Sequence, residues 1–170
     1  MRPADRQSGL EYVYSPPADL PDGCFDAICR LVEAGGSVGS EWIRSNLQRA
    51  FLIGYVLDQN TLIACSSLKE PRPEYIASVK HQTGLDLSNS LERGYTSVKP
   101  AYRGQGIASR LLEELTMRAG GRKIYSIIGE DNIGGQKIAL NNKTKRVAVF
   151  VSQKSGKKLG VWIPEAMLEA

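Results

Sequence analysis

Hydrophobic and polar residues follow two kinds of pattern along this chain, one typical of strands and one of helices. Residues 10–15 (LEYVYS) alternate between the two kinds and predict a strand. Residues 20–36 and 40–50 carry apolar side chains at helical spacing and predict two helices. Two apolar runs within 50–69, separated by a polar Asp-Gln-Asn turn, predict a β-hairpin. The first part of the chain therefore reads strand, two helices, two strands.

The middle of the chain predicts a strand, a helix and a second strand. Residues 91–98 read as a strand, residues 103–120 have a helical period, and residues 123–129 are mostly apolar, as in a strand buried on both faces. A unit of this kind joins parallel neighbours through a right-handed crossover. The apolar stripe expected to bury its helix consists of Ile107, Leu111, Leu112 and Leu115.

The remaining segments predict antiparallel structure. Residues 70–90 are polar and bounded by prolines, and we expect a short helix within this insertion, which could be either the wall or lid of a site or a surface elaboration. Residues 132–144 predict another short helix, and 146–152 pairs with 158–164 as a terminal hairpin. We therefore expect an α/β (α+β) fold with a mixed, mostly antiparallel sheet that contains one parallel pair.

The composition is that of an ordinary globular protein. Hydrophobic residues make up 42% of the 170 residues and charged residues 24%, a balance that argues against intrinsic disorder. This length fits one domain with its own core. The chain has no apolar run of the roughly 20 residues that cross a bilayer, and its first residues do not read as a secretory signal. We expect a cytoplasmic protein.

The cysteine and histidine residues do not suggest a metal site or a disulfide framework. Cys24, Cys29 and Cys65 are an odd number without a CxxC pair, and His81 is the single histidine. We expect no bound metal and interpret the thiols as buried or idle.

Positive charge is concentrated near the C-terminus. Residues 132–164 contain no acidic residue and seven basic ones. Such a field attracts polyanions or a phosphorylated cofactor, although a solvated lysine-rich hairpin would have the same composition.

The stretch 98–115 (VKPAYRGQGIASRLLEEL) joins the end of a predicted strand to the start of a predicted helix. Gly104 and Gly106 allow backbone conformations and close approaches that a side chain would prevent. The helix then begins with free N–H groups at its positive dipole end, a geometry that binds phosphate. Arg103 adds charge and Ser109 a hydroxyl. The spacing is neither GxxxxGK[ST] nor that of a dinucleotide fingerprint.

This turn resembles the acetyl-CoA-binding motif of the GNAT superfamily of N-acetyltransferases, Q/R-x-x-G-x-G/A, which often follows a V-x-P strand end. Arg103, Gly106 and Ala108 occupy its three defining positions. The order of elements over nearly the whole chain is also similar to that family. The resemblance implies a single GNAT-like domain over residues 1–170, with an insertion at about 70–90 and about four to five helices around the sheet.

The resemblance also implies acetyl-CoA as the cosubstrate. Its pyrophosphate would lie on the backbone amides of residues 104–109, and its pantetheine arm beside Val98, where the strand splays from its parallel neighbour. Asn132 would lie beside the cofactor arm, and the basic residues of 132–164 could serve the phosphates. The cofactor-binding residues so implied are Val98, Arg103, Gly104, Gln105, Gly106, Ile107, Ala108, Ser109 and Asn132.

Amine acetylation needs a base, because an aliphatic ammonium has a pKa of about 10.4. Glu92 is our candidate, since it lies six residues before Val98 on one strand and regular alternation puts both side chains on the same face. It also stands eleven residues before Arg103, where the resemblance to histone-type members implies a glutamate base. A solvated strand end or a salt-bridge partner is the alternative role for Glu92. A backbone N–H near Val98 would serve the oxyanion.

The general acid is left open. The family commonly has a tyrosine at the position of Ala139, which leaves water, another tyrosine such as Tyr95 or Tyr125, or spontaneous protonation of the thiolate. A covalent route through Cys65 is disfavoured, because nothing near it in sequence provides a base.

The sequence thus predicts an N-acetyltransferase that moves an acetyl group from acetyl-CoA to a primary amine of a small molecule or peptide, by direct attack in a ternary complex. The alternative is a non-catalytic or weakly catalytic acyl-CoA-binding regulatory module, which the missing tyrosine favours. Nucleic acid is an unfavoured partner because Phe150 and Trp162 fit the hairpin core better than a base-stacking role. We expect no membrane partner, and a homodimer through the last hairpin stays open.

Overall fold

The computed structural model describes residues 9–36 and 40–168, and its centre is a seven-stranded mixed sheet. The order of the strands across the sheet is β1-β2-β3-β4-β5-β7-β6, and all neighbours are antiparallel except β4 and β5. The expected sheet class is therefore confirmed. The strands are β1 (Leu10–Ser15), β2 (Ala50–Asp58), β3 (Thr61–Lys69), β4 (Leu91–Val98), β5 (Ile124–Gly129), β6 (Thr144–Val151) and β7 (Lys158–Pro164).

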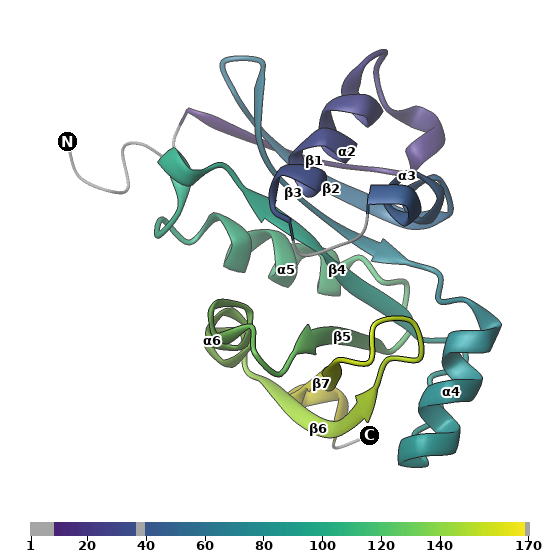
Figure 1. The fold of residues 1–170 in the computed structure, drawn as a ribbon. Coiled ribbons are helices and arrows are strands. Elements are labelled where there is room, and N and C mark those ends of the chain that lie inside the picture. The colour runs from purple at the N-terminus through teal and green to yellow at the C-terminus, as the bar shows by residue number, and fades with distance from the viewer. Residues whose placement is uncertain (1–8, 37–39, 169–170) are drawn as a thin grey trace.

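The described residues form six α-helices, five of them with nine or eleven residues and the last with four. They are α2 (Cys24–Ala34), α3 (Ser40–Gln48), α4 (Pro73–Thr83), α5 (Ile107–Met117), α6 (Ile133–Asn141) and α7 (Glu165–Leu168), with two 3₁₀ turns, η1 (Pro17–Asp19) and η2 (Pro100–Tyr102). In Figure 1, α2 and α3 cover one face of the first half of the sheet and α5 lies on the opposite face.

Two apolar layers hold these helices on the sheet. On one face, Ile28 of α2 and Ile43 of α3 are fully buried in the same cluster as Ile53 of β2. On the other face, Ile107 and Leu111 of α5 are buried in one cluster with residues of β2 and β3. All four residues of the predicted α5 stripe are buried, as the helical spacing indicated.

The insertion between β3 and β4 packs into a third cluster. Val79 of α4 is fully buried against Tyr125 and Phe150, so α4 covers the C-terminal part of the sheet. His81 of the same helix is exposed.

Both hairpins form where the sequence predicted them. β2 and β3 pair antiparallel around Gln59 and Asn60, which both adopt positive φ, as a two-residue turn requires. β7 pairs with β6 and also with β5, and so joins the last hairpin to the sheet. The prediction that β5 is buried on both faces was wrong for its second half, because Ile127 and Ile128 are only half-buried.

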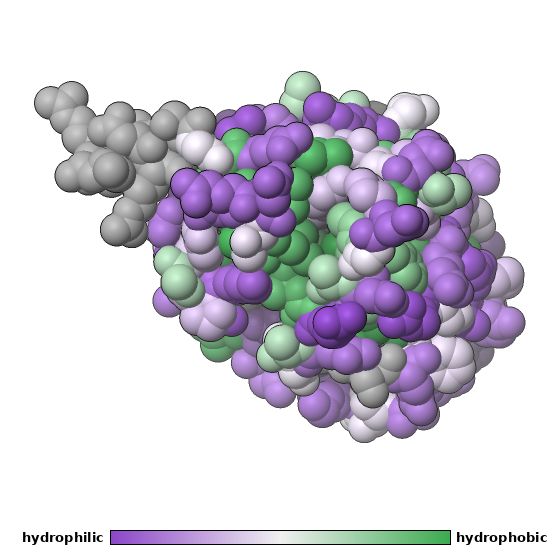
Figure 2. Space-filling model, turned by 90° about the horizontal axis from the view of Figure 1, so that it is seen from above, coloured by the Kyte–Doolittle hydropathy of each residue, from purple (hydrophilic) through white to green (hydrophobic). Residues whose placement is uncertain are grey.

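The surface seen from above the first view has hydrophobic residues in a central hollow, framed by hydrophilic side chains (Figure 2). None of the described helices combines the length and the apolar character that crossing a bilayer requires.

Candidate functional site

The parallel pair in the sheet is very short. β4 and β5 are matched only at Leu91 with Ile124 and at Glu92 with Tyr125. Beyond these two pairs the strands diverge, as Figure 1 shows. The edge of β4 that faces β5 is therefore left without a strand partner over most of its length, which makes its backbone groups accessible to another molecule.

A β-bulge interrupts β4 in the diverging part. Ser67 is opposite Gly94 and Cys65 is opposite Ser97, so that Tyr95 and Thr96 together face a single residue of β3. Tyr95 has a φ of 55°, a left-handed conformation that bulky side chains rarely adopt. An outlier of this kind often marks a functional site.

The bulge changes the face on which the later residues of β4 lie. Glu92 is opposite Lys69 and Val98 is opposite Ala64, and these two β3 residues are five positions apart. Because side chains alternate along a strand, Glu92 and Val98 lie on opposite faces of the sheet. The expectation that they share a face was wrong, since the extra residue of the bulge shifts the alternation by one.

The turn after β4 opens directly into α5. Gly104 and Gly106 have φ values of 75° and 80°, which glycine adopts without strain. Gly106 is the N-cap of α5, and no side chain caps this end of the helix. The first amide groups of α5, at Ile107, Ala108 and Ser109, are thus not used by a capping side chain and lie at the positive end of the helix dipole.

A cavity of about 1030 Å³ lies against this turn. Its wall includes the end of β4, the turn and the first residues of α5, and the opposite side comes from α2 and α6. Seven of the ten sequence-predicted site residues line the cavity: Val98, Arg103, Gly104, Gly106, Ile107, Ala108 and Ser109.

Arg103 organises the end of β4. Its Nε donates a hydrogen bond to the carbonyl oxygen of Val98 at 3.1 Å. Lys99, the residue after Val98, donates its backbone N–H to the carbonyl oxygen of Ile63 in β3. Because successive residues of an antiparallel strand direct their backbone groups to opposite sides, the N–H of Val98 points away from β3.

Gln105, Asn132 and Glu92 are not in the wall of this cavity. Gln105 donates from its side chain to the carbonyl of Ala101. Asn132 is the N-cap of α6, where its side-chain oxygen accepts a hydrogen bond from the N–H of Gly135 at 2.9 Å.

The structure adds wall residues that the motif did not indicate. Ile138 and Asn141 of α6 line the cavity. Its basic wall residues are Arg30, Lys99 and Arg103, and none belongs to the basic stretch 132–164. The idea that this stretch serves a phosphorylated ligand therefore receives no support from the cavity.

Glu92 lies in a polar cluster on the α2 and α3 side of the sheet. One carboxylate oxygen is 3.8 Å from the ammonium group of Lys69, whose side chain is only 8% exposed. Burial lowers the pKa of Lys69, and the nearby carboxylate opposes this shift. Burial, together with the charge of Glu92, raises the pKa of both Tyr75 and Tyr125.

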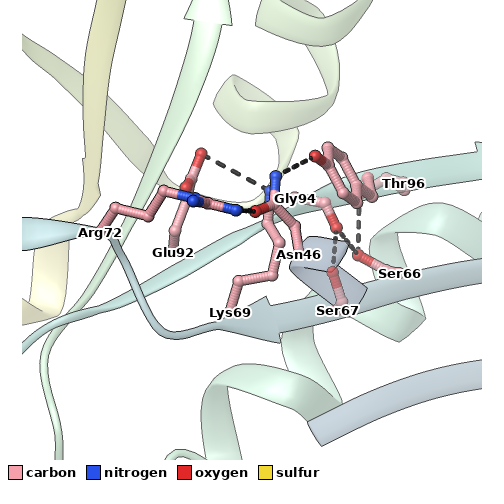
Figure 3. Close-up of polar contacts among 9 residues, drawn as sticks. Asn46, Ser66, Ser67, Lys69, Arg72, Glu92, Gly94 and Thr96 are labelled. Atoms are coloured by element: carbon pink, nitrogen blue, oxygen red, sulfur yellow. Dashed lines mark hydrogen bonds and ion pairs between the residues drawn. The ribbon is translucent and has the colours of Figure 1, made fainter. Parts of the chain in front are cut away.

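The cluster extends through Tyr95 to α3. The ammonium group of Lys69 lies 3.5 Å from the centre of the Tyr95 ring. Asn46 donates to the Tyr95 hydroxyl at 2.8 Å and accepts from Arg72. Figure 3 shows Arg72, Asn46, Lys69 and Glu92 converging at this point. Sequence reasoning missed Asn46, Lys69 and Arg72, which carry no motif.

A buried arginine lies on the opposite face, just beyond the last parallel pair. Arg93 is 4% exposed, and burial lowers its pKa to about 10. It donates to Thr116 of α5 and to Thr144 of β6. These bonds connect α5 with the C-terminal part of the sheet where β4 and β5 diverge.

Cys65 has the environment of a core residue. Its side chain is fully buried, and burial raises the pKa of its thiol to about 12. A thiol that stays protonated is a poor nucleophile.

Comparison with known proteins agrees with this geometry. The family model described as "Acetyltransferase (GNAT) family" matches residues 33–138. Among curated proteins, none has a sequence similar enough to count as a relative.

Several solved structures share the fold. An acyl-CoA N-acyltransferase from Pseudomonas aeruginosa superposes with a TM-score of 0.63 at 16% identity, over 91% of this chain and 99% of that one. The ribosomal-protein-S18-alanine N-acetyltransferase from Escherichia coli gives 0.62 at 11% identity, over 89% and 92%. A chain of the NatC complex bound to Gag peptide and CoA gives 0.60 at 17% identity, over 91% and 98%.

Identities this low show the similarity of fold alone. The family model, in contrast, spans more than half of the residues, including β4, the turn and α5. This protein therefore belongs to the acetyltransferase (GNAT) family.

Proposed function

We propose that the protein transfers the acetyl group of acetyl-CoA to a primary amine of a small molecule or peptide, by direct attack within a ternary complex. One observation carries the proposal: the cavity of about 1030 Å³ lies where the uncapped start of α5 meets the open end of β4. A helix start of this kind is suited to a pyrophosphate, and the edge of an unpaired strand is suited to an amide-containing arm.

Acetyl-CoA would be held by groups of this chain that surround the cavity. The backbone amides of residues 104–109 would bind the pyrophosphate, and Arg30, Lys99 and Arg103 supply positive charge around it. The N–H of Val98 would serve the pantetheine arm or the oxyanion. Asn132 would contribute indirectly, because it caps the start of α6, a helix that lines the cavity.

The reaction needs the amine in its neutral form. Glu92 would accept the proton that the amine loses, and it lies on the face of the sheet where α3 and α4 could receive an acceptor. The nitrogen then forms a bond to the thioester carbon, and the oxyanion of the tetrahedral intermediate is stabilised by a backbone N–H. As the carbon–sulfur bond breaks, the departing thiolate takes up a proton, and the products are the amide and CoA.

The burial of Cys65 supports direct attack over an acetyl-enzyme intermediate. The test is to measure thiol release while the concentrations of acetyl-CoA and an accepted amine are both varied. A ternary complex predicts double-reciprocal lines that intersect, whereas parallel lines would contradict direct attack.

A second candidate function is an acyl-CoA-binding regulatory module with little or no turnover. It is favoured by Ala139, which is buried in α6 and occupies the place of the family's usual tyrosine. Binding of acetyl-CoA without thiol release over a broad amine panel would favour this candidate over the enzyme.

A further inference from the structure

Three segments that are distant in the sequence meet around Trp42 of α3. The guanidinium of Arg72, just before α4, lies 4.9 Å from the centre of the Trp42 ring. The ammonium group of Lys154, in the connection between β6 and β7, lies 3.7 Å from the same ring. Trp42 is 37% exposed, so its ring makes two cation–π contacts at the protein surface.

Arg72 is held in position by neutral groups. Its Nε and one terminal nitrogen donate to the Asn46 side-chain oxygen at 3.4 and 3.2 Å, and the same terminal nitrogen donates to the Ser45 hydroxyl at 3.2 Å. In the described chain, no carboxylate lies within 4.0 Å of Arg72. Of its acidic neighbours along the chain, Glu70 is paired with Arg122, and Glu74 is exposed and forms no ion pair with Arg72.

Several other arginines of the described chain have a carboxylate partner, although Arg93 and Arg103, like Arg72, bond to neutral groups. Arg44 is paired with Asp26, Arg122 with Glu70, and Arg146 with Glu130. The positive charge of Arg72 is thus fixed by hydrogen bonds and stacking but is not neutralised by the protein. A guanidinium with these properties is preorganised to bind an oxyanion.

The position of Arg72 relates it to the proposed acyl-transfer site. Asn46, which accepts from Arg72, donates at the same time to the hydroxyl of Tyr95, a residue of the β4 bulge. The next two residues, Thr96 and Ser97, line the cavity. Figure 3 shows Arg72 and Asn46 beside Lys69 and Glu92 on this side of the sheet.

The charges of the cluster do not cancel. Lys69 and Glu92 form one ion pair, whereas Arg72 and Lys154 have no carboxylate partner among the described residues. Both unpaired cations lie on Trp42 of α3, and Arg72 lies beside Glu92 in the polar cluster (Figure 3). An incoming molecule would therefore encounter positive charge next to the proposed base.

We propose that the acceptor is an amine that also carries a carboxylate, and that Arg72 binds this carboxylate while the amine faces Glu92. The inference rests on the proposed function, because it assigns the substrate class of the same site. Two kinds of acceptor share the required chemistry: a free amino acid, and a peptide whose first residue is acidic. In either kind, the bond to Arg72 fixes the orientation of the nitrogen toward the thioester.

The test uses the CoA-loaded protein and the acetylated products, so that it does not depend on turnover. Two matched pairs are titrated by calorimetry. The first is N-acetyl-β-alanine with N-acetyl-β-alaninamide. The second is acetyl-Asp-Ala-Ala-amide with acetyl-Asn-Ala-Ala-amide.

We expect the carboxylate member of one pair to bind at least about tenfold more tightly than its neutral partner, as a charge-assisted pair predicts. In Arg72→Gln this preference should fall to about twofold or less, because the guanidinium is gone.

Arg72→Lys, which keeps the charge without the planar fork, should retain part of the preference. Lys80→Gln, an exposed residue of α4 paired with Asp86, is the matched control and should keep the full preference. A carboxylate preference in the first pair indicates a free amino acid as the acceptor, and a preference in the second pair indicates a peptide.

Equal affinities within both pairs, no binding of any of the four compounds, or an undiminished preference in Arg72→Gln would overturn the inference. A separate titration with CoA distinguishes this failure from that of the proposed function. Binding of CoA without a carboxylate preference rejects only the acceptor class, whereas the absence of CoA binding rejects the proposed function itself. Melting curves of the variants establish that each is folded.

Discussion

At the scale of single residues, Glu92 has a test that separates chemistry from binding. Its carboxylate is in the polar cluster with Lys69 and not in the wall of the cavity. We expect Glu92→Gln to lower kcat by about 10²- to 10⁴-fold, the range that loss of a general base produces. The affinity for acetyl-CoA, measured by calorimetry, should stay within about twofold of the wild type.

The exposed Glu113 of α5 provides the control, since Glu113→Gln changes the net charge equally without touching the cluster. A kcat for Glu92→Gln equal to that of the control would show that another group, or water, takes the proton from the amine.

Cys65 gives a second prediction at this scale. Because burial keeps its thiol protonated, Cys65→Ala should retain kcat within about threefold and lose only the packing contribution of a small buried side chain. Mass spectrometry of the wild type with acetyl-CoA, without amine, should find no acetyl group on Cys65. A stoichiometric acetyl-thioester there would refute the ternary-complex mechanism.

The sequence located the turn at single-residue resolution but not the face of the sheet on which the proposed base lies. Arg103, Gly104 and Gly106 carry a local motif, and their backbone conformation follows from the glycines. The face on which Glu92 lies depends on the bulge at Tyr95, where a tyrosine adopts a positive φ. Nothing in the local sequence marks that conformation, because the surrounding contacts impose it.

At the scale of elements, an ion pair connects the end of β3 with the start of β5. The two terminal nitrogens of Arg122 donate to the Glu70 carboxylate, and its Nε donates to the Asn89 carbonyl at 2.9 Å. The hydrogen bonds from Arg122 hold the pKa of Glu70 below its ordinary value.

This pair predicts the direction of a pH effect on stability. A carboxyl whose pKa is lowered by folding contributes stability above its unfolded pKa, about 4.3, and loses that contribution as the pH falls through the folded value. The melting temperature of the wild type should therefore exceed that of Glu70→Gln at pH 7, and the difference should shrink below about pH 4. A difference that is constant with pH, or that grows in acid, would contradict this role. Glu113→Gln again serves as the control.

The elements themselves followed from local patterns to a large extent. The buried stripe of α5 and both hairpins were predicted from periodicity and turn residues. The second half of β5 was not, because its exposure depends on the divergence of β4, which is a property of two strands and not of one. The role of α4 as a packing element against Phe150 also depends on residues far away in the sequence.

At the scale of the whole molecule, the cavity is bordered by α2 from the N-terminal part and α6 from the C-terminal part. A ligand that contacts both parts binds only the folded chain and should stabilise it as a unit. At 100 times the dissociation constant the expected gain is about 2.7 kcal/mol, which thermal unfolding in the presence of CoA would detect as a rise in melting temperature. An unchanged melting temperature at saturating CoA would contradict binding to the native state.

The arrangement around Trp42 also belongs to this scale. Trp42, Arg72 and Lys154 come from three separate segments, and only the folded sheet brings them together. For this reason the motif in the sequence indicated the acyl donor, whereas the acceptor side could be approached only from the structure.

The most direct test of the account is a calorimetric titration of acetyl-CoA into the wild type, Ala108→Trp and Met117→Trp. Ala108 lines the cavity in the first turn of α5, where a large side chain fits the helix but fills the proposed phosphate site. Met117, at the other end of the same helix, is 76% exposed and tests the effect of the indole alone. We predict equal affinities for the wild type and Met117→Trp, and a loss of at least about tenfold in Ala108→Trp. No binding to the wild type, or undiminished binding to Ala108→Trp, would contradict the assignment of this turn to the cosubstrate.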